Sequence, residues 1–309
     1  MRKASLECVY ELAKVDPRVI FIGSDLGPGV LDEMKNEMPD RFLMEGVAEQ
    51  HIVGMAAGLA MEGYLPFVNT IATFLTRRCF EQVAVDLCLH DLPVRLIANG
   101  GGTVYAPLGP THLAIEDIAL MRSLPNMTVV AVCDAEEMKR LMKKTISWPH
   151  PMYIRLAKGG DKTISKSDSN FEIGKAILMK DGKDATIIST GIMTQKAIEA
   201  SDYLASKGLD IAVLHVHTIK PLDTTAILEV AAKDKPIVTV EEHIRNGGLG
   251  SAVLEKISDF KPRFSKNIKR LGLPDKFPDQ YGSQSSLLER YKLTTLQLSK
   301  AVSDAIEVR

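Results

Sequence analysis

The sequence predicts a two-domain α/β protein in which each domain holds a mostly parallel sheet with helices on both faces. Short, nearly continuous apolar segments alternate with longer amphipathic ones, a pattern typical of buried parallel strands and their covering helices. The alternation is interrupted once, where residues 158–170 are polar and rich in Gly and Ser. We therefore expect domains at residues 1–160 and 171–309, joined by a linker at 161–170. A chain of 309 residues is long enough for both.

The first domain contains five apolar runs of strand length, with four longer segments between them. The strands are expected at Val19–Gly23, Leu65–Val68, Val94–Ala98, Thr128–Val132 and Met152–Leu156. The helices are expected at Ala48–Met61, Thr76–Leu89, Leu113–Arg122 and Ala135–Thr145. Beyond the linker, further strands are expected at Ala185–Thr190, Ile211–Val216, Ile237–Val240 and Ile268–Leu271.

The composition of the chain excludes disordered and fibrous proteins and argues against binding to nucleic acid or membranes. The chain is 45% apolar and 25% charged, which is ordinary for a globular protein, and its net charge of −1 leaves no basic excess. Four cysteines without Cys-x-x-Cys spacing predict neither a disulfide framework nor a metal site. No signal peptide or apolar run of about 18 residues is visible, so we expect a cytoplasmic protein.

The helical pattern singles out Glu49 as a candidate functional residue. On the predicted helix Ala48–Met61, Glu49 precedes Ile52 by three residues and Val53 by four, so it shares their apolar stripe. Two interpretations stay open. Glu49 is a first-turn residue favoured by the helix dipole, or it is a carboxylate aimed inward. An inward carboxylate needs a hydrogen-bond partner, because an isolated buried charge is too costly.

The segment Gly46–Leu59, GVAEQHIVGMAAGL, resembles the pyrimidine-binding domain of transketolases and 1-deoxyxylulose-5-phosphate synthases. Other strings typical of that family follow in the same order. They are Arg2-Lys3-Ala4-Ser5, Gly23-Ser24-Asp25-Leu26, Thr73-Phe74-Leu75, Gly109-Pro110-Thr111-His112 and Pro125-Asn126-Met127, then Ile219-Lys220-Pro221-Leu222-Asp223 and Gly247-Gly248-Leu249-Gly250 in the second domain. The resemblance implies a pyrimidine-binding domain at 1–160 and a transketolase C-terminal domain at 171–309.

One motif of the family is absent from this sequence. Single-chain members hold the cofactor's diphosphate through Mg²⁺ with a Gly-Asp-Gly motif, and no Gly-Asp-Gly occurs here. The resemblance therefore implies the C-terminal subunit of a split transketolase. Its partner would be an N-terminal subunit that carries the diphosphate-binding domain and most of the Mg²⁺ ligands. We expect a heterotetramer with two copies of each subunit around a dimeric core.

The resemblance also implies thiamine diphosphate as the cofactor and assigns residues to its pyrimidine ring. Glu49 matches the glutamate that bonds N1′ of the aminopyrimidine and so promotes removal of the thiazolium C2 proton. Phe74 matches the aromatic residue that stacks on the ring, with a plain core phenylalanine as the alternative. Ile71 stands where transketolases carry a second aromatic residue, so part of the pocket is expected to be aliphatic.

Asp25 and Arg78 are also expected near the cofactor. Asp25 matches a carboxylate near the thiazolium, and a helix N-cap or turn aspartate is the alternative. Arg77 and Arg78 lie close to Phe74 in the sequence. They line the entrance of the pocket or pair with Glu81 across a helical turn.

Three residues match substrate-binding positions of the family. His112 would hydrogen-bond the donor sugar near the bond that breaks. Arg155 matches an arginine that grips the substrate phosphate, and Arg2 matches a second one, because a planar guanidinium can bond two phosphate oxygens. The alternatives are an interdomain ion pair for Arg155 and a frayed terminus for Arg2.

Two departures from the family bear on sugar specificity. Leu108 replaces the acidic residue that normally precedes Gly-Pro-Thr-His, and Gly100, Gly101 and Gly102 stand where the family carries a His or an Arg. These differences predict a roomier and less polar mouth of the active site.

The implied reaction is transfer of a two-carbon ketol unit from a ketose phosphate to an aldose or aldose phosphate. Three alternatives stay open. They are an enzyme like 1-deoxyxylulose-5-phosphate synthase, the β-type subunit of a 2-oxoacid dehydrogenase, and a non-catalytic scaffold that keeps the fold. Intact Glu49, Phe74 and His112 argue against the scaffold, since a scaffold needs none of them.

Overall fold

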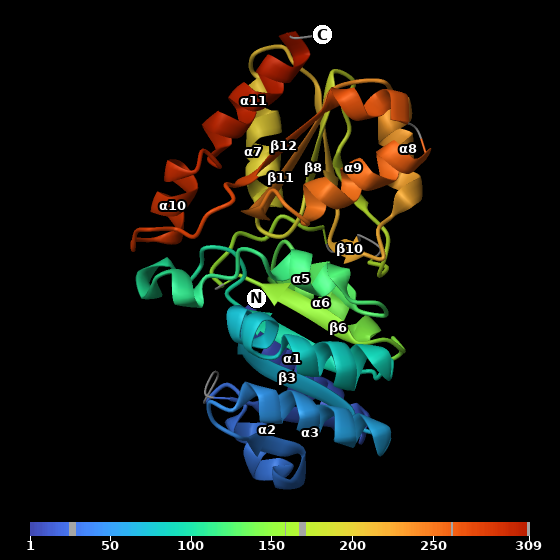
Figure 1. Cartoon of the computed structure of the whole chain (residues 1–309), viewed down its shortest axis with the longest axis vertical. Helices are drawn as coiled ribbons and strands as arrows, with labels where there is room; N and C mark the ends of the chain where they lie inside the picture. Colours follow the sequence, from blue (N-terminus) through green and yellow to red (C-terminus); the bar gives the residue numbers. More distant parts are fainter. Residues whose placement is uncertain (25–28, 158, 167–170, 261, 308–309) are drawn as a thin grey trace.

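The computed structural model describes residues 1–24, 29–157, 159–166, 171–260 and 262–307. The two halves of the chain lie end to end along the long axis of the molecule, the first half below and the second above (Figure 1). One sheet of seven strands and one of five organise them. Both sheets are mostly parallel and covered by helices, so the predicted two-domain α/β class is confirmed.

Six strands of the first half form most of the first sheet, and all their pairings are parallel. They are β1 (Val19–Gly23), β2 (Phe42–Met44), β3 (Leu65–Ile71), β4 (Arg95–Asn99), β5 (Thr128–Ala131) and β6 (Met152–Leu156), in the spatial order β5-β6-β4-β3-β1-β2. Every residue of β1, β3, β4, β5 and β6 is buried, which is why these strands read as apolar runs. The edge strand β2 is partly exposed, and the sequence does not predict it.

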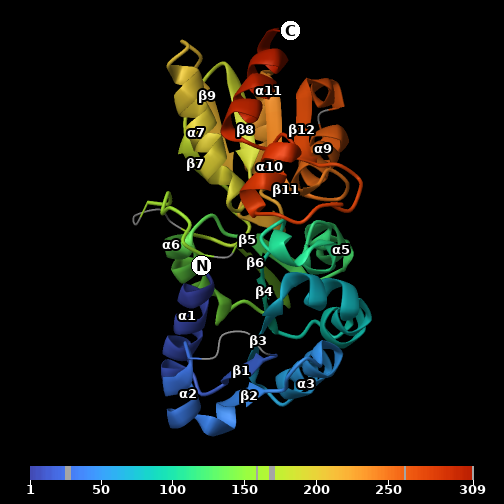
Figure 2. The ribbon, with the colours of Figure 1, turned by 90° about the vertical axis from the view of Figure 1, so that its left-hand side faces the viewer.

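Helices cover both faces of the first sheet (Figure 2). They are α1 (Arg2–Val15), α2 (Asp32–Glu37), α3 (Glu49–Met61), α4 (Phe80–Gln82), α5 (Asp117–Ser123) and α6 (Ala135–Thr145). Helices α1 and α6 pack together on one face, while α3 and α5 share the apolar core on the other. The predicted helix at 76–89 is instead two wide π-helical stretches, Phe74–Arg78 and Val83–Leu89, on either side of α4.

The second half repeats this architecture with fewer strands. Its sheet has the order β12-β11-β8-β9-β7, in which only the pairing of β7 is antiparallel. The strands are β7 (Ile177–Lys180), β8 (Ala185–Ser189), β9 (Ile211–His215), β11 (Ile237–Ile244) and β12 (Ile268–Leu273). Helices α7 (Met193–Ala205) and α11 (Thr295–Glu307) pack on one face, α8 (Thr224–Ala232) and α9 (Leu249–Phe260) on the other, and α10 (Gln284–Arg290) lies beside the boundary between the halves (Figure 1).

A strand and a buried polar pair join the two halves. β10 (Thr218–Lys220) comes from the second half but pairs antiparallel with β5, so it is the seventh strand of the first sheet. Nearby, His215 Nε2 lies 2.9 Å from Oε2 of Glu137 on α6, and both side chains are fully buried. Burial alone would raise the pKa of Glu137, but His215 outweighs it and holds the pKa at about 2. Within the described ranges, no helix is both long and apolar enough to cross a membrane.

Candidate active site

A ladder of buried polar side chains marks the carboxyl ends of β1, β3 and β4. Ser24 Oγ donates to Thr70 Oγ1 at 2.8 Å, and Asn99 Nδ2 donates to Asn69 Oδ1 at 2.8 Å. All four residues are buried. Ligands of open parallel sheets bind outside the carboxyl ends of the strands, so this edge is the candidate site.

Glu49 is the first residue of α3 and points into the protein. Its side chain is 1% exposed, and its Oε2 accepts a hydrogen bond from Arg78 Nη1 at 2.5 Å. The carboxylate also lies close to Cys79. Burial and the Glu49 charge together raise the pKa of the Cys79 thiol to about 12. Glu49 is thus a carboxylate aimed inward with the partner that this placement requires.

Arg78, Phe74 and His112 extend from Glu49 as one contiguous group. The guanidinium carbon Cζ of Arg78 lies 4.4 Å from the centroid of the Phe74 ring. The rings of Phe74 and His112 meet edge to face, with centroids 5.2 Å apart and an interplanar angle of 65°. We call Glu49, Phe74, Arg78 and His112 the Glu49 cluster. Ile71 is also buried, at the end of β3.

Arg77 holds the loop that carries His112. Its guanidinium pairs with Glu116, and Nη1 donates to the carbonyl of Pro110 at 3.2 Å. In the described part of the chain, both neighbouring arginines therefore pair with carboxylates other than Glu81. The contact between Arg77 and Glu116 joins residues 39 positions apart in the sequence, so no local sequence pattern predicts the position of this loop.

The segment Gly100–Gly102 is enclosed by neighbouring side chains. A Cβ on Gly101 would lie 2.5 Å from Nε of Arg155, and one on Gly102 would lie 2.5 Å from Cδ of Glu242. Gly102 also has a positive φ of 74°, which disfavours other residues. The prediction that these glycines leave a roomier mouth is therefore wrong, because other side chains take up the space.

Arg155, at the end of β6, is buried between the two halves. Its Nε donates to Asp117 Oδ2 at 2.7 Å, and its Nη2 donates to the carbonyls of Ala114 at 3.1 Å and Glu242 at 2.9 Å. The Tyr153 hydroxyl also donates to Asp117, at 2.8 Å. Burial lowers the pKa of Arg155, but the Asp117 carboxylate outweighs it and raises that pKa. The ion pair with Asp117 therefore lies within the first half, and the contact with the second half is the hydrogen bond to the Glu242 carbonyl, so the expected interdomain ion pair is replaced by an interdomain hydrogen bond.

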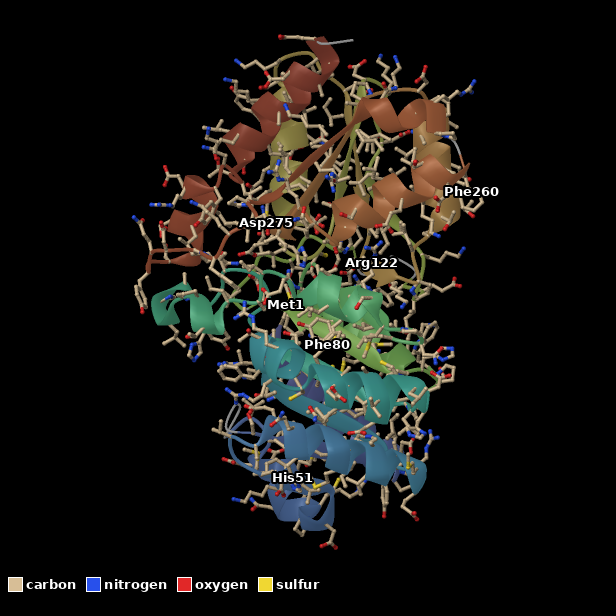
Figure 3. All side chains as sticks on the ribbon, in the orientation of Figure 1. Met1, His51, Phe80, Arg122, Phe260 and Asp275 are labelled. Carbon is tan, nitrogen blue, oxygen red and sulfur yellow. The ribbon has the colours of Figure 1, made fainter. Side chains whose placement is uncertain are left out.

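The remaining candidates lie near the boundary between the halves or outside the described residues. Arg2 begins α1 and is half-buried, and its neighbour Met1 lies at that boundary (Figure 3). The N-terminal turn of a helix favours anions, which suits the expected phosphate contact. Asp25 falls in the segment 25–28, which is not described, so its place near the thiazolium stays a prediction.

Two parts of the site are not predicted from the sequence. Asn69 and Asn99 each stand near the carboxyl end of a buried strand, and that position is the signal that could have found them. Asn99 Oδ1 is buried without a hydrogen-bond partner among the described residues. Glu242, from the second half, accepts a hydrogen bond from Thr103 N at 2.9 Å and so shapes a loop beside the site. Burial raises the pKa of the Glu242 carboxyl.

Comparison with known proteins gives matches along both halves. The family model described as "Transketolase, pyrimidine binding domain" matches residues 1–160, and "Transketolase, C-terminal domain" matches residues 174–298. The 6-deoxy-6-sulfo-D-fructose transketolase subunit SqwH of Clostridium sp. (strain MSTE9) is 33% identical over 308 residues, covering 99% of this chain and 94% of that protein. An apulose-4-phosphate transketolase subunit of Phocaeicola vulgatus is 37% identical over 276 residues, covering 89% and 87%.

A solved structure and a longer enzyme complete the comparison. A structure described as "Split gene transketolase, inactive beta4 tetramer" has a TM-score of 0.89 at 36% identity and covers 99% of this chain and 97% of that one. A 1-deoxy-D-xylulose-5-phosphate synthase of Syntrophotalea carbinolica is 38% identical over 294 residues, but the chain spans 46% of that protein. The chain belongs to the transketolase family. Within it, the chain carries the pyrimidine-binding and C-terminal domains and matches separate subunits of split enzymes over most of their length.

The Glu49 cluster fits the pyrimidine end of thiamine diphosphate, the cofactor that the pyrimidine-binding domain implies. Glu49 is a buried acceptor, and Phe74 is a half-buried aromatic ring beside it. Asn99 Oδ1, which has no hydrogen-bond partner among the described residues, is a further acceptor at the same edge of the sheet. A planar heterocycle with N–H groups at its rim can use each of these features.

Proposed function

We propose that this subunit supplies the pyrimidine-binding half of a split transketolase active site. The assembled enzyme would transfer a two-carbon ketol unit from a ketose phosphate to an aldose or aldose phosphate. The observation that carries the proposal is the placement of Glu49. A glutamate that merely favours a helix dipole lies at the surface, whereas this one is 1% exposed and contacts one long cationic side chain beside an aromatic ring.

In this proposal each residue of the cluster has one task. Thiamine diphosphate, when bound, supplies an acidic carbon that becomes the nucleophile toward the donor sugar. Glu49 holds the proton that it shares with N1′ of the aminopyrimidine, and so controls the protonation of that ring. Phe74 contacts the ring without leaving a polar group unpaired. His112 hydrogen-bonds the donor sugar from the loop that Arg77 holds.

The proposed site needs a second chain to complete it. An N-terminal subunit with a diphosphate-binding domain would supply most Mg²⁺ ligands, and two copies of each subunit would form the heterotetramer. Two kinds of relative support this arrangement. The sulfofructose and apulose-4-phosphate relatives are both named as subunits of a transketolase, and the solved split-gene transketolase is described as an inactive beta4 tetramer.

The proposed donor is a ketose with an acidic group. The names of two subunit relatives contain a sulfonated and a phosphorylated sugar, which supports this class. Arg2 is the proposed ligand of the acidic group, because its guanidinium can bond two oxygens and it stands at a helix N-terminus. Arg155 has its Nε and Nη2 engaged within the subunit, so it is the weaker candidate for this contact.

Reconstitution tests the proposal. The purified chain is combined with a candidate N-terminal subunit, thiamine diphosphate and Mg²⁺, and ketol transfer is measured with a panel of ketose phosphates. We expect activity in the mixture and none from either chain alone. Transfer by this chain alone would refute the split site. Turnover with pyruvate as donor instead would favour the synthase-like alternative.

Glu49→Gln tests the proposed role of the carboxylate. The amide keeps the shape but cannot hold the N1′ proton, so kcat should fall by about 10²–10⁴-fold with unchanged assembly in size-exclusion chromatography. Exchange of the cofactor's C2 proton for deuterium, followed by NMR on the assembled enzyme, should slow in parallel. Fast exchange in this variant would exclude the catalytic role.

A further inference from the structure

We infer, on the basis of the proposed function, that Arg78 occupies the pyrimidine pocket when no cofactor is bound and leaves it when the pyrimidine enters. The proposed function gives the pyrimidine two contacts, a hydrogen bond to Glu49 and an aromatic contact with Phe74. Arg78 makes both itself. Its Nη1 lies 2.5 Å from Oε2 of Glu49, and its Cζ lies 4.4 Å from the centroid of the Phe74 ring.

The chemistry of the guanidinium explains why Arg78 can substitute for the ring. A guanidinium is flat, carries its N–H donors around its rim, and places its face against aromatic rings. An aminopyrimidine that shares a proton at N1′ with Glu49 has the same combination of a flat face and N–H donors at the edge. One side chain of this kind therefore satisfies the carboxylate and the aromatic ring at once, which a lysine ammonium would not do as well.

Glu49 needs such a substitute while the cofactor is absent. Its side chain is 1% exposed, and in the described ranges of the chain Arg78 provides its one hydrogen bond and its one ion pair. A buried carboxylate with no partner is strongly destabilising. The Arg78 cation thus stabilises the empty pocket, and the pyrimidine must provide equivalent contacts before the arginine can leave.

Arg78 is also placed to leave without disturbing the fold. Its side chain is 42% exposed, and it is the last residue of the π-helical stretch Phe74–Arg78, a type of segment common at functional sites. The adjacent Arg77 differs. Its guanidinium pairs with Glu116 and donates to two backbone carbonyls, so Arg77 stays fixed while Arg78 turns outward into solvent.

Removing Arg78 should open the pocket to a pyrimidine. The probe is 4-amino-5-hydroxymethyl-2-methylpyrimidine, the ring fragment of the cofactor, titrated into the full chain and followed by saturation-transfer NMR. We expect Arg78→Met to bind it about tenfold more tightly than the unmodified chain, because the competing contact is lost. Arg78→Lys, which keeps the charge but not the planar group, should show a smaller gain. If Arg78→Met does not fold, the affinity of Arg78→Lys for the probe tests the inference instead.

The control is Arg18→Met, which removes an arginine from an exposed ion pair with Asp16 and should leave the affinity unchanged. Equal or weaker binding by both Arg78 variants would overturn the inference, because it would mean that Arg78 does not compete with the pyrimidine for the pocket. Absence of binding in every variant and in the unmodified chain would also overturn the inference, whereas the proposed function fails separately, if the reconstituted pair of subunits shows no ketol transfer. The two failures are therefore distinguishable.

A second measurement does not depend on comparing affinities between variants. A double-mutant cycle over Glu49→Gln and Arg78→Met, read from thermal unfolding midpoints, should show coupling between the two residues in the cofactor-free chain. A saturating concentration of the pyrimidine probe should abolish that coupling, because Arg78 no longer contacts Glu49. Coupling that persists unchanged with the probe bound would contradict the displacement of Arg78.

Discussion

Replacing Arg155 by Met should destabilise the subunit far more than it changes the preference for phosphorylated sugars. In the structure Arg155 is 7% exposed and Asp117 is fully buried. The substitution removes two hydrogen bonds to Asp117, at 2.7 and 3.2 Å, and leaves it the one from the Tyr153 hydroxyl. The carbonyl of Glu242 in the other half also loses its donor.

The size of the expected loss of stability follows from the burial of the Asp117 charge, which remains after the substitution. Removing one partner of a buried ion pair typically costs about 3–5 kcal/mol, because the other charge is left without compensation. At an unfolding entropy of about 2.1 cal/mol/K per residue, such a loss in a chain of 309 residues corresponds to a fall in Tm of about 5–8 °C. Thermal unfolding followed by circular dichroism, and by the fluorescence of Trp148, the one tryptophan of the sequence, measures it.

Two further variants make this test specific. Arg18→Met breaks an exposed pair with Asp16 and should change stability by about 1 kcal/mol or less. The double variant Arg155→Met with Asp117→Asn should recover part of the lost stability, because no unpaired charge is buried. A native Tm for Arg155→Met, together with selective loss of activity on phosphorylated substrates, would refute the structural role of Arg155 and establish it as a ligand of the substrate phosphate.

Three other predictions address pH, thiol access and substrate binding. The pKa of Glu137 is held at about 2, below its usual 4.5, so the stability it supplies is present above about pH 4.5 and is lost as pH falls toward 2. Glu137→Gln should reduce this loss of stability at low pH, measured by urea unfolding at a series of pH values. An unchanged loss would contradict the pairing with His215. Cys8 is half-buried and the other three cysteines are buried, so a chromogenic disulfide reagent at pH 8 should titrate about one thiol natively and four in denaturant. Rapid reaction of a second native thiol would show that the core opens. Arg2→Ala should raise KM for phosphorylated donors about tenfold or more while sparing uncharged ones, and an equal effect on both would exclude a phosphate contact.

Local patterns in the sequence determined the strands and helices that lie fully inside one half. β1, β6 and α6 have the predicted bounds, because a strand buried on both faces is mostly apolar and an amphipathic helix repeats its apolar residues at a fixed spacing. The same reasoning placed Glu49 on the buried stripe of α3. The strings shared with the transketolase family then supplied the roles expected of the site residues.

The tertiary structure alone decided which partners the charged and polar groups meet. Arg78 pairs with Glu49 and Arg77 with Glu116, although Glu81 lies closer to both in the sequence. Arg155 bonds Asp117 and the carbonyl of Glu242, 38 and 87 positions away. The space beside Gly101 and Gly102 is filled by side chains from β6 and β11. β10 likewise joins a sheet built from the other half. Such contacts carry no local signature, since burial requires that each polar group find a partner but does not specify, along the chain, which partner it is.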